Sequence, residues 1–227
     1  MEGLPCEVGW EPVPWRPDAF YLSERPPFTF DPLLHAGVYY VQEASSMYVA
    51  KLLKDYGCDV PCCALDLCAA PGGKSTLLAS LLPEGSLLVS NEPMPKRANV
   101  LAENMQKWTR MPEGHYPVES IVTNNYPADF GAFSGCFDLV VTDVPCSGEG
   151  MFRKDEEAVR QWSEDNVALC QARQRRILAD VWPSLAQGGV FIYSTCTFNR
   201  YENDLNVLWA SEELGAECMF AEDVLGG

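Results

Sequence analysis

The chain has 227 residues, 47% of them hydrophobic, which fits one α/β domain with a sizeable core and excludes a disordered or fibrous protein. No apolar run approaches the about 20 residues that a bilayer-crossing helix needs, and the first residues lack the features of a signal peptide, so we expect a cytoplasmic protein. The formal net charge of −16 argues against tight binding to phosphates, although basic residues cluster at Lys96–Arg97, Arg153–Lys154 and Arg173–Arg176.

Ten cysteines are present, and several of them sit inside apolar runs, which is typical of reduced, buried thiols. The most closely spaced ones form no CxxC pair: they are Cys58, Cys62, Cys63 and Cys68. The two histidines, His35 and His115, stand alone. Because structural zinc sites need closely spaced thiolate and imidazole ligands, we expect no metal site.

Prolines interrupt residues 1 to about 35, and each of them fixes its own φ and lacks an N–H group. We therefore expect an extended, irregular lead-in, whose many aromatic residues indicate that it packs on a surface. From Glu43 to Tyr56 apolar residues recur at helical spacing, and Gly57 offers a stop.

After Gly57 short apolar segments alternate with helical ones. The expected strands are Ala64–Asp66, Leu87–Asn91, Ser120–Thr123, Phe137–Asp143 and Gly189–Thr195, with a sixth at Ala216–Phe220. The expected helices are Lys74–Leu82, Pro95–Trp108, Glu164–Trp182 and Asn203–Glu212. Strands this apolar, each followed by a helix, predict an α/β fold with a mostly parallel sheet and helices on both faces.

A glycine-rich turn, LDLCAAPGGKS, follows the first of these strands over Leu65–Ser75. Its small residues let a ligand approach the backbone, and the helix that begins there offers unpaired N–H groups. It is not a phosphate-binding P-loop, because the pattern GxxxxGK[ST] requires glycine where Cys68 stands. The turn predicts a site for a nucleoside without a pyrophosphate, and the alternative is a tight turn with nothing bound.

The next strand ends in Asn91–Glu92, and Glu92 lies 19 residues after Gly73. A carboxylate about 20 residues after such a turn typically accepts hydrogen bonds from a ribose. The alternative is an ordinary exposed acid.

Two cysteines follow the ends of two later strands, in TDVPCSGEGMFRK (Thr142–Lys154) and YSTCTFN (Tyr193–Asn199). Ligands of open α/β sheets bind at this edge. If these strands are neighbours, about 4.8 Å apart, Cys146 and Cys196 face one cavity beside Asp143. A single such cysteine is usually a small buried hydrophobe, but two at one edge favour chemistry.

Together, LDLCAAPGGKST, FDLVVTDVPCSGEGMFRK and YSTCTFNRYEN resemble the RNA 5-methylcytosine methyltransferases, a family that contains bacterial 16S ribosomal RNA cytosine methyltransferases and the eukaryotic Nop2/Sun proteins. The segment HAGVYYVQEASSM (His35–Met47) is similar to the one that precedes the cofactor turn in that family. The resemblance spans residues 30 to 210, roughly. It implies a Rossmann-like class I methyltransferase fold, S-adenosylmethionine as the methyl donor, and a structured RNA, ribosomal in kind, as the substrate.

The resemblance also implies roles for individual residues. The methionine end of the cofactor would be held by Ala69, Ala70, Pro71, Gly72, Gly73, Lys74 and Ser75. Glu92 would bind its ribose, and Asp143 would contact both the cofactor and a flipped cytosine. Cys196 would be the nucleophile that attacks carbon 6, and Cys146 would help to release the product.

One position departs from the family pattern. The family usually carries an aspartate after the third strand, which contacts the adenine, whereas this chain has Asn124, Asn125 and Tyr126. The expectation is that Asn125 supplies an amide hydrogen bond instead, or that Asp129 reaches in.

In this family RNA-binding domains flank the catalytic core. By this comparison residues 1–40 are a proline-rich remnant of the N-terminal RNA-binding subdomain, and residues 41–227 are a catalytic domain that stops before the last strand, so we expect a catalytic-domain fragment. Alternatives are an inactive RNA-binding or assembly remnant and a methyltransferase of tRNA or DNA cytosine. An exocyclic-amine methyltransferase is disfavoured, because DVPC (Asp143–Cys146) replaces its Asp/Asn-Pro-Pro-aromatic motif.

Overall fold

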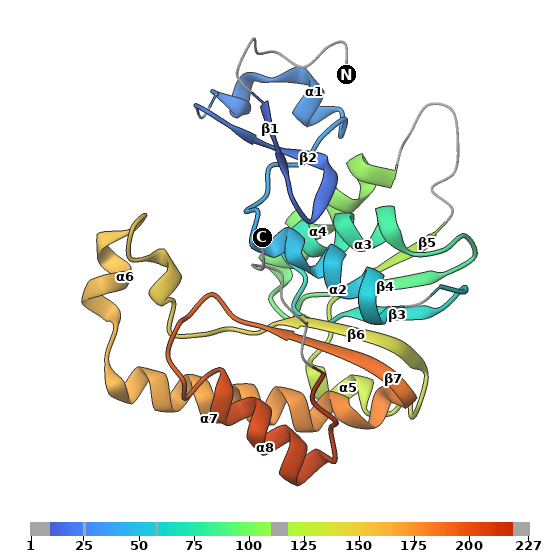
Figure 1. Cartoon of the computed structure of the whole chain (residues 1–227), viewed down its shortest axis with the longest axis vertical. Coiled ribbons are helices and arrows are strands. Elements are labelled where there is room, and N and C mark those ends of the chain that lie inside the picture. Colours follow the sequence, from blue (N-terminus) through green and yellow to red (C-terminus); the bar gives the residue numbers. More distant parts are fainter. Residues whose placement is uncertain (1–9, 25, 58, 110–117, 220–227) are drawn as a thin grey trace. The chain divides into compact units, whose positions relative to one another are not determined.

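The computed structural model describes residues 10–24, 26–57, 59–109 and 118–219 (Figure 1). The chain forms two compact units, Met1–Asn124 and Asn125–Gly227. Within the described ranges, no helix is both long and apolar enough to span a membrane.

The first unit begins with a β-hairpin in the segment that was expected to be irregular. Strand β1 (Trp10–Val13) pairs antiparallel with β2 (Arg16–Leu22), and the rings of Trp10 and Phe20 pack edge to face with their centroids 5.3 Å apart. The prediction of an irregular lead-in is therefore wrong for these residues. The prolines did not exclude strands here, because both strands of a two-stranded sheet are edge strands. At such an edge a proline that lacks an N–H removes no hydrogen bond to a further strand.

The rest of the first unit alternates helices and strands. Its helical elements are η1 (Phe28–Phe30), α1 (Pro32–His35), η2 (Ser46–Tyr48), α2 (Val49–Tyr56), α3 (Gly73–Leu81) and α4 (Pro95–Thr109). Its strands β3 (Cys63–Asp66), β4 (Leu87–Asn91) and β5 (Glu119–Thr123) are parallel in the order β5-β4-β3. Since Asp66 pairs with Ser90 and Asn91 pairs with Thr123, all three strands end at one edge.

The second unit contains a second parallel pair, β6 (Phe137–Asp143) beside β7 (Leu185–Ser194). Its helical elements are α5 (Pro127–Phe130), η3 (Glu149–Met151), α6 (Glu156–Gln161), α7 (Glu164–Val181), η4 (Trp182–Ser184) and α8 (Asp204–Leu214). Helix α7 packs against α5 and α8 (Figure 1). Asp143 pairs with Ser194, so β6 and β7 also end together, and the segments that carry the two cysteines leave the sheet side by side.

The parallel α/β class that the sequence predicts is confirmed in both units, and β4 and β6 have the expected bounds. The sixth strand is wrong for residues 216–219, which form no strand, while Phe220 lies outside the described residues. Helix α8 ends at Gly215, which has a φ of 73°, and the chain after it is largely exposed. Without a neighbouring strand to bond, a short apolar segment alone does not make a strand.

Candidate cofactor and two-cysteine sites

The turn after β3 is built around a buried acid. Asp66 is fully buried, and its Oδ2 accepts a hydrogen bond of 2.7 Å from the Ser75 hydroxyl. Gly72, where α3 begins, has a φ of 114°, a conformation that side chains disfavour, and an added Cβ there would lie 3.3 Å from Leu101 Cδ1. The peptide bond between Ala70 and Pro71 is cis, and Pro71 is exposed.

The predicted cofactor residues of this turn occupy different environments. Ala69, Ala70 and Gly72 are buried, and Gly73 and Lys74 are half-buried. Ser75 is fully buried, and its hydroxyl donates to Asp66, so its side chain stabilises the turn. Small residues of this kind let a ligand approach the backbone closely.

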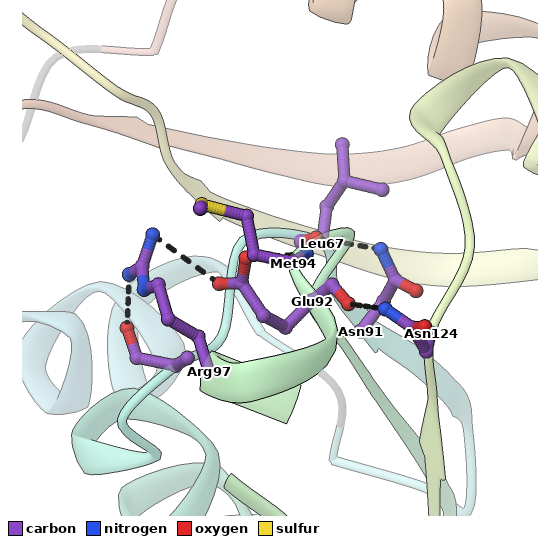
Figure 2. A network of polar contacts seen from close by, with 7 residues as sticks. Leu67, Asn91, Glu92, Met94, Arg97 and Asn124 are labelled. Atoms are coloured by element: carbon purple, nitrogen blue, oxygen red, sulfur yellow. Dashed lines mark hydrogen bonds and ion pairs between the residues drawn. The ribbon is translucent and has the colours of Figure 1, made fainter. Parts of the chain in front are cut away.

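Glu92 is not an ordinary exposed acid, because only 1% of it is exposed. Its Oε1 accepts a hydrogen bond of 3.0 Å from the Met94 N–H, and its Oε2 lies 3.5 Å from Nη1 of Arg97. Arg97 also donates from Nη2 to the carbonyl of Ala70, at 2.8 Å (Figure 2). One half-exposed guanidinium therefore joins the glycine-rich turn to the expected ribose acceptor.

The backbone at this edge is cross-linked by two asparagines. The amide of Asn91 donates to the Leu67 carbonyl at 3.0 Å, and the amide of Asn124 donates to the Glu92 carbonyl at 2.6 Å (Figure 2). Sequence reasoning singled out neither Arg97 nor these two amides as site residues. The signal that was available for Arg97 is its position in the first turn of α4, five residues after Glu92.

The two candidates for the adenine contact lie at the start of α5. Nδ2 of Asn125 lies 3.4 Å from Oδ2 of Asp129, and the same Oδ2 accepts a hydrogen bond of 2.9 Å from the Tyr126 N–H. Asp129 thus holds the beginning of its own helix, which weakens the alternative that it reaches a ligand. Asn125 has an exposed side chain and stays the candidate.

In the second unit Cys146 and Cys196 place their Sγ atoms 3.0 Å apart. Cys146 follows β6 and is half-buried, whereas Cys196 follows β7 and is exposed. Oδ1 of Asp143 accepts a hydrogen bond of 3.1 Å from the Ser194 hydroxyl, which fixes this carboxylate at the ends of the two strands. The prediction that the two thiols meet at one sheet edge is confirmed.

Cys196 is also tied to the segment of Cys146 through the backbone. The Gly150 N–H donates to the Cys196 carbonyl at 2.7 Å, and an added Cβ at Gly150 would lie 2.4 Å from that oxygen. No side chain fits there, so glycine is required for this close approach.

The pKa of the Cys146 thiol is raised, first by its hydrogen bond with Cys196 and then by burial. A thiolate is better solvated at the more exposed of two thiols. The hydrogen bond and burial thus both favour the protonated form of Cys146, and Cys196 is the thiol that is more exposed to solvent.

A buried polar network contacts the residues on either side of Cys146, and sequence reasoning missed it. Its fully buried members are Gln174 of α7, Asn206 of α8, and Glu202 just before α8. Among the residues that the structure describes there is no cluster able to hold a metal ion and no disulfide. Cys58 and His115, which entered the expectation on metals, lie outside the described residues.

Comparison with solved structures defines the class. A crystal structure described as a methyltransferase homologue from Pyrococcus horikoshii superposes with a TM-score of 0.73 at 26% identity, and the match covers 91% of this chain and 62% of that one. The fold is accordingly the Rossmann-like fold of class I methyltransferases, as the sequence predicts.

The family follows from two further matches. The model of the 16S rRNA methyltransferase RsmB/F matches residues 59–212, and the model of the N-terminal domain of 16S rRNA methyltransferase RsmF matches residues 3–44. The chain belongs to the RsmB/F family of 16S rRNA methyltransferases.

Relatives with the name ribosomal RNA small subunit methyltransferase F include proteins from Pectobacterium atrosepticum and Shewanella oneidensis. The first is 36% identical, over 96% of this chain and 46% of its own length. The second is 39% identical, over 86% of this chain and 40% of its own length. The chain thus spans about half the length of the curated relatives that it matches.

Proposed function

We propose that this chain is the catalytic part of an enzyme that transfers a methyl group from S-adenosylmethionine to carbon 5 of a cytosine in ribosomal RNA. The observation that carries the proposal is the contact between Cys146 and Cys196 at 3.0 Å, just after the strand ends at which Asp143 pairs with Ser194. Two thiols at one sheet edge suit a reaction that needs one nucleophile and one group that assists its release. Membership of the RsmB/F family supports RNA, and ribosomal RNA in particular, as the substrate.

The first unit fits the cofactor. The turn from Ala69 to Lys74 presents backbone and small side chains, which suit the methionine end, and Glu92 suits the ribose hydroxyls. A carboxylate has about four lone-pair positions, and the Met94 and Arg97 contacts of Glu92 use only part of them. In this proposal Asn125 supplies the contact to the adenine.

Bound S-adenosylmethionine would supply an electrophilic methyl group. The thiolate of Cys196 adds to carbon 6 of the cytosine and forms an S–C bond, and the electron pair of the 5,6 double bond then makes carbon 5 nucleophilic. Asp143 shares a proton with ring nitrogen 3 and holds the exocyclic amine. The methyl group would move from the sulfonium to carbon 5, leaving S-adenosylhomocysteine. A base then takes the proton from carbon 5, the 5,6 double bond re-forms, and the S–C bond to Cys196 breaks.

Cys146 would act in the second half of the reaction. Its thiol would donate to the departing thiolate of Cys196 through the 3.0 Å contact and so stabilise it. The reaction requires a cytosine that has left its stack, so the target lies in single-stranded or opened RNA. We propose that residues 1–40 belong to an N-terminal RNA-binding part, which the family match over residues 3–44 supports.

Transfer of tritiated methyl groups to RNA pools, followed by nucleoside analysis, tests this function. Labelled 5-methylcytidine from ribosomal RNA is the expected product. Label in another nucleoside would overturn the proposed chemistry. A chain that binds the cofactor and RNA but labels nothing, even with its flanking domains present, would favour the alternative of an inactive RNA-binding remnant.

A further inference from the structure

We propose that Glu202, acting with Gln174, is a positioning residue that sets the place of Cys146 during product release. The inference rests on the proposed function for its consequence in the reaction, but its structural part does not depend on that function. Glu202 is fully buried, and its described hydrogen-bond donors are one backbone N–H and two side-chain amides. A buried carboxylate is unfavourable unless such bonds compensate the lost hydration. The groups that donate these bonds to Glu202 are therefore held in defined positions.

The first set of bonds brackets Cys146 on both sides. The N–H of Ser147 donates to Glu202 Oε2 at 3.0 Å, and the carbonyl of Pro145 accepts from Gln174 Nε2 at 3.0 Å. The same Nε2 lies 2.7 Å from Glu202 Oε2, so the two hydrogens of one amide join the carbonyl and the carboxylate. Both peptide groups that flank Cys146 are thereby attached to one buried pair of side chains.

The second set of bonds reaches the segment of Cys196. Asn199 donates from Nδ2 to Glu202 Oε1 at 2.8 Å, and its Oδ1 accepts from the Glu202 N–H at 2.9 Å. Asn199 is half-buried and lies three residues after Cys196 in the loop that precedes α8. A single carboxylate thus holds the loops of both cysteines, and the 3.0 Å separation of the thiols depends on it from each side.

The orientation of the Gln174 amide is fixed by its oxygen. Oε1 of Gln174 accepts from Asn206 Nδ2 at 2.8 Å and from the Tyr193 hydroxyl at 3.2 Å. Its nitrogen therefore faces Pro145 and Glu202. Because this nitrogen is a donor, the group at the position of the Glu202 carboxylate must be a hydrogen-bond acceptor. Replacing the Glu202 carboxylate by an amide keeps the size of the side chain. Its N–H₂ group would then face another N–H₂ group, that of Asn199 or that of Gln174, and two donors cannot form a hydrogen bond.

Glu202→Gln is therefore the test variant, and Glu212→Gln is its matched control, because Glu212 is an exposed acid on α8. The first measurement is alkylation of the two thiols by iodoacetamide in the 227-residue chain, read by mass spectrometry. We expect the ratio of the Cys146 rate to the Cys196 rate to change at least about threefold in Glu202→Gln and to stay unchanged in Glu212→Gln, since thiol reactivity follows local environment. An unchanged ratio in both variants overturns the proposal.

The second measurement uses the reaction itself, with the flanking domains present. Glu202→Gln should lower kcat about tenfold with little change in KM, and it should accumulate a covalent protein–RNA species, because release and not binding is slowed. A rise in KM alone would overturn the inference and leave the proposed function intact. If the wild type has no activity on any RNA, the proposed function fails, whereas the alkylation ratio still tests the positioning of Cys146.

Gln174→Met provides a second variant in case Glu202→Gln does not fold. Met has a similar volume to Gln but removes the bond to the Pro145 carbonyl, so the alkylation ratio should shift here as well. Thermal unfolding checks that each variant is folded at the assay temperature. If both variants are unfolded there, the network serves stability, and the proposed positioning role is wrong.

Discussion

The Sγ atoms of Cys146 and Cys196 lie 3.0 Å apart although 50 residues separate them in the chain. The contact follows from the register of β6 and β7, in which Asp143 pairs with Ser194 and each cysteine follows its strand end. Of the two thiols, Cys196 is the more exposed, and the pKa of Cys146 is raised by its hydrogen bond with Cys196 and by burial. This asymmetry gives the two cysteines distinguishable behaviour.

The first prediction concerns the pH dependence of Cys146. Its pKa lies above that of an ordinary thiol, so it carries less thiolate at neutral pH and should react slowly with iodoacetamide, with a rate that rises as the pH rises. The main cause is its hydrogen bond with Cys196. Cys196→Ala should therefore shift the midpoint of the alkylation profile of Cys146 to lower pH, as measured by mass spectrometry, and a midpoint that stays in place would refute this cause.

The second prediction concerns Glu92. Replacing this buried acid by alanine should weaken binding of S-adenosylmethionine by about 1–3 kcal/mol, the scale for leaving polar partners unpaired. Isothermal titration calorimetry measures the change, with Glu103→Gln as the control, because Glu103 is an exposed acid on α4. Wild-type affinity in Glu92→Ala would remove Glu92 from the cofactor site.

The third prediction concerns Arg97, which joins the Ala70 carbonyl to the Glu92 carboxylate. Because the guanidinium is half-exposed, we expect Arg97→Ala to weaken cofactor binding by only about 1 kcal/mol. Lysine keeps the charge, but its single ammonium nitrogen cannot contact both the Ala70 carbonyl and the Glu92 carboxylate as the guanidinium does. Arg97→Lys should therefore not retain the full wild-type affinity. Lys96→Ala, a change at an exposed neighbour, is the control, and equal losses in both alanine variants would mean that only net charge matters.

The fourth prediction concerns RNA binding by the 227-residue chain, whose net charge is −16. Few phosphates can be neutralised, so binding at about 150 mM salt should be weak, with a small dependence on salt concentration. Adding a basic flanking domain should tighten it far more than adding cofactor does. Submicromolar binding of the bare chain at that salt concentration would contradict the prediction.

Much of the fold was predictable because it depends on local patterns. In the run Phe137–Asp143 five of the seven residues are buried, and largely apolar segments of that length mark the strands of a parallel sheet. The β1–β2 hairpin was missed because its prolines were expected to interrupt regular structure. The sixth strand was predicted from a pattern at 216–220 that has no partner strand among the described residues.

The positions of the two cysteines and Glu92 at a sheet edge were predictable for a similar reason, because Glu92 directly follows β4 and the cysteines lie three and two residues after β6 and β7. The supporting residues were not, because their contacts bridge long stretches of chain. Gln174 reaches Pro145 across 29 residues, and Arg97 reaches Ala70 across 27. In the sequence Gln174 is simply one polar residue of a polar helix, and nothing local shows that it is fully buried.

The central claim is that Cys196 forms the covalent bond to cytosine and that Cys146 acts only in release. The most direct test incubates the Cys146→Ala and Cys196→Ala variants, with the flanking RNA-binding domains present, with cofactor and target RNA, and analyses them on denaturing gels. Cys146→Ala should accumulate a covalent protein–RNA species, because the bond forms but is released slowly, and Cys196→Ala should form none. A trapped species with Cys196→Ala and none with Cys146→Ala would contradict the account and reverse the two roles.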